Sequence, residues 1–227
     1  MRTLCVVQAR MGSTRLPGKV LAELAGRPAL GLMLDRLAPL PVDQLVVATS
    51  TADADDRIEE LANEKAVAIV RGPEDDVLAR FVLALDAYPA THVVRLTADC
   101  PLMDPALVAT ALEVHERKSA DYTSNTLVRT FPDGLDIEVV TAAALYEANA
   151  ESADPYEREH VTPFIYRRPD RYALADFRSG AELGDERWTL DTAADLERLH
   201  EMVGLVDSPV TATWRDILSA ADRHAAS

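Results

Sequence analysis

The chain has 227 residues, a mass of 24.8 kDa and a formal net charge of −15 at pH 7. This acidity argues against nucleic acids and anionic membranes, which are bound through summed lysine and arginine contacts, and favours a small-molecule partner. No apolar run approaches the roughly 20 residues that span a bilayer, and the start does not read as a secretory signal. We therefore expect a cytoplasmic protein whose residues 1–227 form one domain, because no linker interrupts the sequence.

The first half of the chain alternates apolar runs with helical patterns. Strands are predicted at residues 2–8, 44–50, 67–72 and 91–97, and apolar residues recur every three or four positions in the segments between them. Near-continuous apolar strands separated by helices are typical of a mainly parallel sheet covered on both faces. The expected fold class is therefore a doubly wound α/β fold.

After residue 120 the alternation is less regular. Short strands are predicted at residues 135–141, 172–177 and 187–190. Apolar residues at helical spacing predict helices at 143–152, 155–168, 192–204 and 211–225. The second half therefore continues the α/β pattern without an internal repeat.

The segment Gln8–Leu21, QARMGSTRLPGKVL, directly follows the first predicted strand. A loop at the carboxyl end of a parallel strand lies where open α/β sheets bind ligands, and its glycines let backbone amides turn toward an anion. Arginine and lysine side chains would add charge-assisted hydrogen bonds to phosphate oxygens. The loop contains neither G-x-x-x-x-G-K-[ST] nor G-x-G-x-x-G, and a solvated cationic turn is the alternative. We predict a phosphate-binding loop formed by Ala9, Arg10, Gly12, Ser13, Arg15 and Lys19.

This loop resembles the N-terminal signature of the cytidylyltransferases that activate acidic sugars, such as the CMP-3-deoxy-manno-octulosonate and CMP-acylneuraminate synthetases. Five further segments resemble the spore-coat polysaccharide (SpsF) group of that family: RGPEDDVLARF, RLTADCPLMDP, FPDGLDIEVV, EREHVTPFIYRRP and WTLDTAADLERL. The resemblance runs from about residue 3 to about residue 200. It implies a nucleotide-diphospho-sugar transferase type of fold, CTP as the nucleotide, a sugar acid or similar acidic acceptor, and a homodimer.

Two aspartates are candidates for a metal site. Asp99 follows the predicted strand 91–97, so it should reach the same sheet edge as the cationic loop. Asp191 precedes a predicted helix, where an ordinary N-cap is the alternative. In the family that the resemblance implies, the aspartates of the D-x-P and D-T-x-x-D-L motifs hold Mg²⁺, and they match Asp99 and Asp191. Two carboxylates with substrate phosphates and water suit Mg²⁺, and Mn²⁺ is a second candidate.

The candidate acceptor-binding residues lie in two segments. Asp136 and Glu138 are two apart on a predicted strand and share one side, which fits either contacts with acceptor hydroxyls, a second metal, or a polar strand face. Glu157 and His160 are three apart on a predicted helix, where a charged exposed face would look the same. A histidine titrates near neutral pH, so His160 could orient or deprotonate an acceptor hydroxyl.

Two arginines complete the set of site residues. Arg71 and Arg80 lie in the segment that the resemblance implies is near the nucleotide. For Arg80, an ion pair with Asp76 four residues earlier is the competing explanation.

Together these features predict a Mg²⁺-dependent transfer of CMP from CTP to an acidic acceptor, with Arg10, Lys19, Asp99 and Asp191 as the catalytic residues. A glycosyltransferase remains an alternative, but it typically has a D-x-D motif after a strand, where this chain has ADCP. A non-catalytic nucleotide-binding module is a second alternative, which would need the loop but not the two aspartates.

Overall fold

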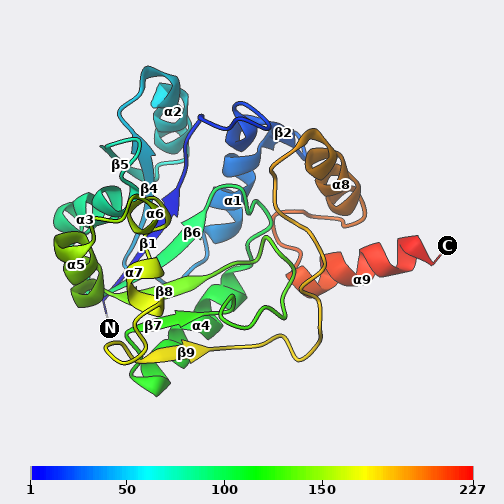
Figure 1. Cartoon of the computed structure of the whole chain (residues 1–227). Helices are drawn as coiled ribbons and strands as arrows, with labels where there is room; N and C mark the ends of the chain where they lie inside the picture. The colour runs from blue at the N-terminus through cyan, green and yellow to red at the C-terminus, as the bar shows by residue number, and fades with distance from the viewer. Residues whose placement is uncertain (1, 227) are drawn as a thin grey trace.

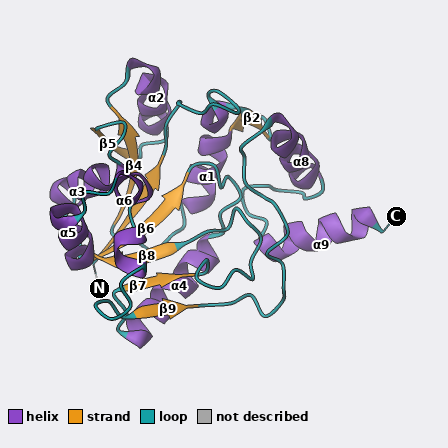
Figure 2. Ribbon diagram, viewed as in Figure 1, coloured by secondary structure: helices purple, strands orange, loops and turns teal. Residues whose placement is uncertain are grey.

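The computed structural model describes residues 2–226 (Figure 1). Within this range a seven-stranded sheet has the order β5-β4-β1-β6-β8-β7-β9, with helices on both of its faces (Figure 2). Its strands are β1 (Thr3–Gln8), β4 (Gln44–Ser50), β5 (Ala68–Gly72), β6 (His92–Thr97), β7 (Tyr122–Ser124), β8 (Glu138–Thr141) and β9 (Leu174–Asp176). The short strands β2 (Glu23–Leu24) and β3 (Arg27–Pro28) pair separately.

The helices follow the strands along the chain. The α-helices are α1 (Ala29–Leu37), α2 (Asp56–Glu64), α3 (Val77–Ala87), α4 (Pro105–Lys118), α5 (Ala142–Glu151), α6 (Pro155–His160), α7 (Pro163–Tyr166), α8 (Ala193–Gly204) and α9 (Trp214–Ala225). Two 3-10 turns, η1 (Lys19–Leu21) and η2 (Asp53–Asp55), follow β1 and β4. The termini lie on opposite sides of the view, with α9 projecting at the C-terminal side (Figure 1).

The strand order creates a switch point beside β1. Strands β5, β4, β1 and β6 are parallel, whereas β8 runs antiparallel to both β6 and β7. The chain moves from β1 to β4 and β5 on one side, and then returns to place β6 on the other side of β1. In open α/β sheets the crevice outside the carboxyl ends of two such strands is where ligands bind. The expected doubly wound, mainly parallel α/β fold is confirmed.

Two hydrophobic cores cover the two faces of the sheet. Successive side chains of a strand point to opposite faces. Leu4 and Val6 of β1 accordingly pack in the core formed with α3 and α5, whereas Cys5 and Val7 pack in the core formed with α1 and α4. All four side chains are fully buried. This double burial explains why β1 reads as a continuous apolar run in the sequence.

Two predicted elements differ in the structure. Residues 187–190 do not form a strand, because only an isolated bridge joins Arg187 to Asp133. The predicted helix 155–168 is broken into α6 and α7 at Val161, whose φ of 71° and ψ of −56° form a tight turn. Pro163 lacks an N–H group, so it cannot continue the hydrogen bonds of α6. The helix α4 and the strand β7 were not predicted.

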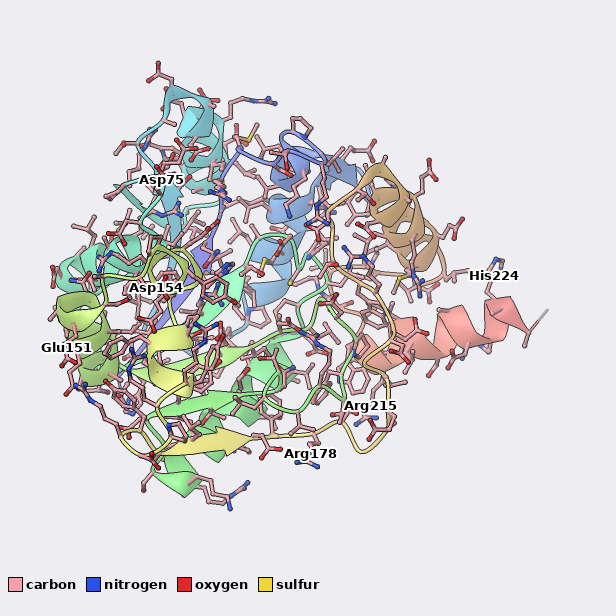
Figure 3. All side chains as sticks on the ribbon, in the orientation of Figure 1. Asp75, Glu151, Asp154, Arg178, Arg215 and His224 are labelled. Carbon is pink, nitrogen blue, oxygen red and sulfur yellow. The ribbon has the colours of Figure 1, made fainter. Side chains whose placement is uncertain are left out.

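Charged side chains project from the outer surface. Figure 3 shows the side chains of Glu151, Arg178 and His224 pointing outward from the ribbon. Within residues 2–226 no helix combines the length and apolarity that crossing a membrane requires.

Candidate active site

The predicted phosphate-binding loop borders a cavity at the carboxyl ends of β1 and β6. This cavity, called cavity 1 below, has a volume of about 430 Å³. Its lining comes from the loop after β1, the end of β6, the helices α3 and α6, and the segment before α8. All six loop residues predicted to bind phosphate line it: Ala9, Arg10, Gly12, Ser13, Arg15 and Lys19.

A buried aspartate that the sequence analysis did not select holds the loop in place. Asp55 accepts a hydrogen bond of 2.7 Å from the Met11 amide and further ones from Thr49 and Ser50 at the end of β4. Burial alone would raise the pKa of Asp55, but these hydrogen bonds lower it below its usual value. On the other side of the loop, Gly18 has a φ of 71° and donates to the Met11 carbonyl at 3.1 Å. The loop is therefore anchored at Met11 from both directions.

Three charged side chains meet at the centre of cavity 1. The Lys19 ammonium lies 2.9 Å from Asp99 Oδ2 and 2.7 Å from Asp191 Oδ1. A backbone hydrogen bond of 2.8 Å from the Leu190 amide to the Asp99 carbonyl brings the two aspartates side by side. Burial opposes the charge of Lys19, but the two carboxylates raise its pKa above the usual value. The structure thus joins three of the four predicted catalytic residues, from segments far apart in the sequence.

Asp191 is available for this cluster because another residue caps α8. The N-cap is Thr192, which forms a capping box with Asp195, so the N-cap alternative for Asp191 is wrong. Asp191 Oδ2 instead contacts Arg15 at 3.0 Å and Arg187 at 2.8 Å. Burial works against its ionisation, but Lys19 above all, with these arginines, lowers the pKa of Asp191. Asp191 is therefore held as a carboxylate that faces cations.

The same arrangement tests whether a divalent cation suits the site. Asp99 and Asp191 each direct a carboxylate oxygen at the Lys19 ammonium, which occupies the position that a metal ion shared by the two carboxylates would take. Carboxylate oxygens beside a phosphate-binding loop are the ligands that Mg²⁺ and Mn²⁺ accept. The donor set of these two residues therefore fits the predicted metal.

Arg80 is buried at the wall of cavity 1 with unmet hydrogen-bonding capacity. Its exposed fraction is 1%, and in residues 2–226 its Nε and Nη1 atoms have no hydrogen-bond partner. The proposed ion pair with Asp76 is wrong, because Asp76 caps α3 and pairs with Arg158 at 2.7 Å. Burial, followed by the charge of Arg10, lowers the pKa of Arg80. Unpaired buried donors cost free energy, so Arg80 is suited to receive an oxygen-rich ligand.

A second cavity adjoins the first. Cavity 2 has a volume of about 490 Å³ and shares Arg95, Thr97 and His160 with cavity 1. Both carboxylates predicted on one strand side line it, although Asp136 lies just before β8. The two cavities therefore place a nucleotide-sized space beside a second ligand-sized space.

The carboxylates of cavity 2 have different partners. Arg129 grips Asp136 with two hydrogen bonds of 2.7 Å each. Glu138 is buried and accepts hydrogen bonds from Arg95, from Tyr122 at 2.5 Å and from Thr162 at 2.5 Å. The Glu138 side chain is only 9% exposed, so this residue organises the cavity wall, whereas the Asp136 side chain is 31% exposed and keeps part of its surface open.

His160 lies at the junction of the two cavities. It is the last residue of α6, its ring packs against Tyr156 with centroids 4.2 Å apart, and the neighbouring Glu159 contacts Arg10 at 3.5 Å. The turn at Val161 then directs the chain so that Thr162 reaches the wall of cavity 2. A strained backbone of this kind in a β-branched residue persists only where the surroundings hold it. The turn therefore positions His160 and Thr162 in relation to each other.

Two predicted site residues lie outside both cavities. Arg71 on β5 is held at 2.6 Å by both Asp56 and Glu59 of α2. Glu157 binds Ser152 at 2.6 Å and Arg168 at 2.9 Å, and is buried in that position. These partners lie on α2, at the end of α5 and just after α7, so both residues have local structural roles.

The chain is similar to proteins of one family along most of its length. The family model described as "Cytidylyltransferase" matches residues 4–202. The spore coat polysaccharide biosynthesis protein SpsF of Bacillus subtilis is 35% identical over 205 residues, which cover 86% of this chain and 84% of that protein.

Solved structures extend the similarity to the fold. A cytidylyltransferase from Leptospira borgpetersenii superposes with a TM-score of 0.94 at 30% identity, covering 100% of this chain and 96% of the other. The CMP:2-keto-3-deoxy-manno-octonic acid synthetase in complex with CTP has a TM-score of 0.69 at 17% identity, covering 90% and 99% of the two chains, and shares the fold. From the match over residues 4–202 and the identity to SpsF, this chain belongs to the cytidylyltransferase family of enzymes.

Proposed function

We propose that the protein transfers CMP from CTP to an oxygen of a small acceptor and releases pyrophosphate. The observation that supports this most strongly is the meeting, in cavity 1, of an anchored cationic loop with two aspartates at the carboxyl edge of the sheet. A second cavity that opens beside these groups supports a two-substrate reaction.

The nucleotide would occupy cavity 1. Arg10 and Arg15 would bind the β and γ phosphates, together with the backbone around Gly12 and Ser13. The unpaired donors of Arg80 would gain oxygen acceptors from the bound nucleotide. Nothing in this set of contacts requires a covalent enzyme intermediate.

Asp99 and Asp191 would hold Mg²⁺ or Mn²⁺. When bound, such an ion would supply positive charge close to the triphosphate. Because the Lys19 ammonium lies between the same carboxylates, Lys19 would exchange these partners for phosphate oxygens when the nucleotide and the ion are bound. Lys19 would then stabilise the leaving pyrophosphate.

The acceptor would bind in cavity 2. An acceptor hydroxyl at the junction would lie beside His160, which can orient it or accept its proton as the oxygen attacks the α-phosphorus in line. A sugar acid or similar acidic acceptor is the class that the family resemblance predicts. A homodimer in the cytoplasm is likewise a prediction of sequence and resemblance, and light scattering in solution would test the dimer.

The test is phosphorus NMR of the protein incubated with CTP, Mg²⁺ and a set of sugar-acid acceptors. Pyrophosphate and a CMP-linked product should appear in equal amounts, with CTP preferred over ATP, GTP and UTP. Asp99→Asn is the control, because it keeps the size of the side chain and removes the charge that binds the ion. Release of a nucleoside diphosphate from a nucleotide sugar, without consumption of any triphosphate, would instead identify a glycosyltransferase.

A further inference from the structure

The two arginines that line cavity 2 already bind carboxylates of the protein. Arg129 uses two nitrogens to grip Asp136, and Arg95 donates to Glu138. In these pairs the positive charges of the two arginines are balanced by the two carboxylates of the cavity wall. A ligand carboxylate could therefore form two parallel hydrogen bonds with Arg95 or Arg129 only by displacing the protein carboxylate that the arginine already binds.

Displacing Asp136 from Arg129 would be unfavourable. A second carboxylate, Asp133, already lies 3.4 Å from the same guanidinium. Asp133 and Asp136 thus share the Arg129 guanidinium, and Arg187 contacts Asp133 alone, at 3.5 Å. A displaced Asp136 would face Asp133 without a cation of its own, and leaving a partly buried charge unpaired is costly.

Hydroxyl groups can join the same pair without breaking it. Each carboxylate oxygen accepts more than one hydrogen bond, so Asp136, which is only partly buried, can accept from ligand hydroxyls while it stays on Arg129. Leu127, Pro163 and Tyr166 add apolar surface to the wall, which suits the C–H faces of a sugar ring. The volume of about 490 Å³ lies in the range of small-molecule sites.

We propose that cavity 2 binds the uncharged, hydroxyl-bearing part of a carbohydrate acceptor, with the Arg129–Asp136 pair as the contact that determines specificity. A carboxylate on the acceptor is not the group that cavity 2 recognises. The inference rests on the proposed function only in giving the bound carbohydrate the role of acceptor. The shared wall of Arg95, Thr97 and His160 places one end of such a ligand next to cavity 1.

The test is calorimetric titration of the protein with two matched probes, 3-deoxy-manno-octulosonate and its uncharged methyl ester. The two should bind with affinities within about threefold of each other. Asp136→Asn should weaken both by roughly tenfold or more, because hydrogen bonds to a charged group are lost. Leu127→Trp, at an exposed position on the rim, should weaken both by filling the cavity, and its fold is checked by circular dichroism.

Two results would overturn this inference. One is an acid that binds at least tenfold more tightly than its ester and binds more tightly still to Asp136→Asn, because Arg129 would then be a receptor for the acceptor carboxylate. The other is failure of both probes to bind at millimolar concentration. Titration of CTP with Mg²⁺ into the wild-type protein and the same variants separates the two proposals. If the wild-type protein binds the sugar probes but not CTP, the proposed function alone is refuted.

Discussion

Lys19 and a divalent ion should compete for the same two carboxylates. The Lys19 side chain is 13% exposed, and its partners Asp99 and Asp191 are 30% and 18% exposed. Lys19→Ala would leave both carboxylates partly buried without their shared cation, which costs roughly 2 kcal/mol. For a chain of this length the Tm should fall by about 4–8 °C. The ordinary assumption that a loop lysine is neutral for stability does not apply to this partly buried, doubly paired ammonium.

Mg²⁺ should reverse this loss in the variant. With the ammonium removed, the two carboxylates can bind the ion without first giving up a partner. An ion at about 100 times its Kd stabilises by roughly 2.7 kcal/mol, so saturating Mg²⁺ should restore the Tm of Lys19→Ala. In the wild-type protein without nucleotide the rise should be smaller, because part of the binding free energy is used to displace Lys19.

The assay is thermal unfolding of both proteins with and without Mg²⁺. Lys65→Ala is a matched control, because Lys65 forms a comparable pair with Asp35 at 2.7 Å, away from cavity 1. It should lose stability without gaining a response to Mg²⁺. If Lys19→Ala and Lys65→Ala respond equally to the ion, Asp99 and Asp191 do not hold it. Turnover of Lys19→Ala should also fall by roughly 10² to 10³.

Three further substitutions test other parts of the site. Arg80→Met replaces a buried guanidinium with unpaired donors by an apolar chain, so it should stabilise the nucleotide-free protein by about 1 kcal/mol in urea unfolding. It should also weaken CTP binding by roughly tenfold or more, and unchanged CTP affinity would remove Arg80 from the site. Gly134→Ala should destabilise the protein strongly and abolish activity, because the new Cβ would lie 2.5 Å from the Trp188 backbone. Gly180→Ala is the control: Gly180 also has a positive φ but no atom within 4 Å of the added Cβ, so it should cost only about 1 kcal/mol in the same unfolding assay. Equal losses in the two variants would contradict the steric argument. Burial works to raise the pKa of Asp195, but hydrogen bonds from Arg187 and Thr192 lower it to about 2. The ionised carboxylate therefore stabilises the fold above about pH 4. Asp195→Asn should cost about 2 kcal/mol of unfolding free energy at neutral pH, and this cost should vanish as the pH falls toward 2. A cost that does not change with pH would exclude that ion pair as its source.

The parallel half of the sheet was predictable because its strands carry their own signal. Strands buried on both faces are apolar throughout, so residues 2–8, 44–50, 67–72 and 91–97 were predicted to within one residue at each end. The segment 187–190, RWTL, was predicted as a strand from its alternation of polar and apolar residues, but its backbone hydrogen bonds go to Asp133 and Asp99 instead of a neighbouring strand. Such pairings depend on the tertiary fold and leave no periodic pattern in the sequence.

The location of the candidate site residues was predictable where they directly follow a strand, and less so on helices. Asp99 and the loop after β1 occupy strand ends, whose common edge follows from the parallel order. Arg71 and Arg80 carry the same charge in the same segment, and only the acidic face of α2 decides that one is paired and the other is not. Asp55 has one available signal, a carboxylate shortly after β4 at the same edge. Its contact with Met11 depends on the path of the loop.

The cluster of Lys19, Asp99 and Asp191 joins residues as far as 172 positions apart. During synthesis the loop leaves the ribosome first, yet it cannot meet Asp191 until nearly the whole chain has followed. An incomplete or partly folded chain would therefore lack the paired carboxylates, even with its first strands formed. Nucleotide and metal affinity should then act as a measure of complete folding, and the substrates themselves should favour the finished molecule over every shorter intermediate.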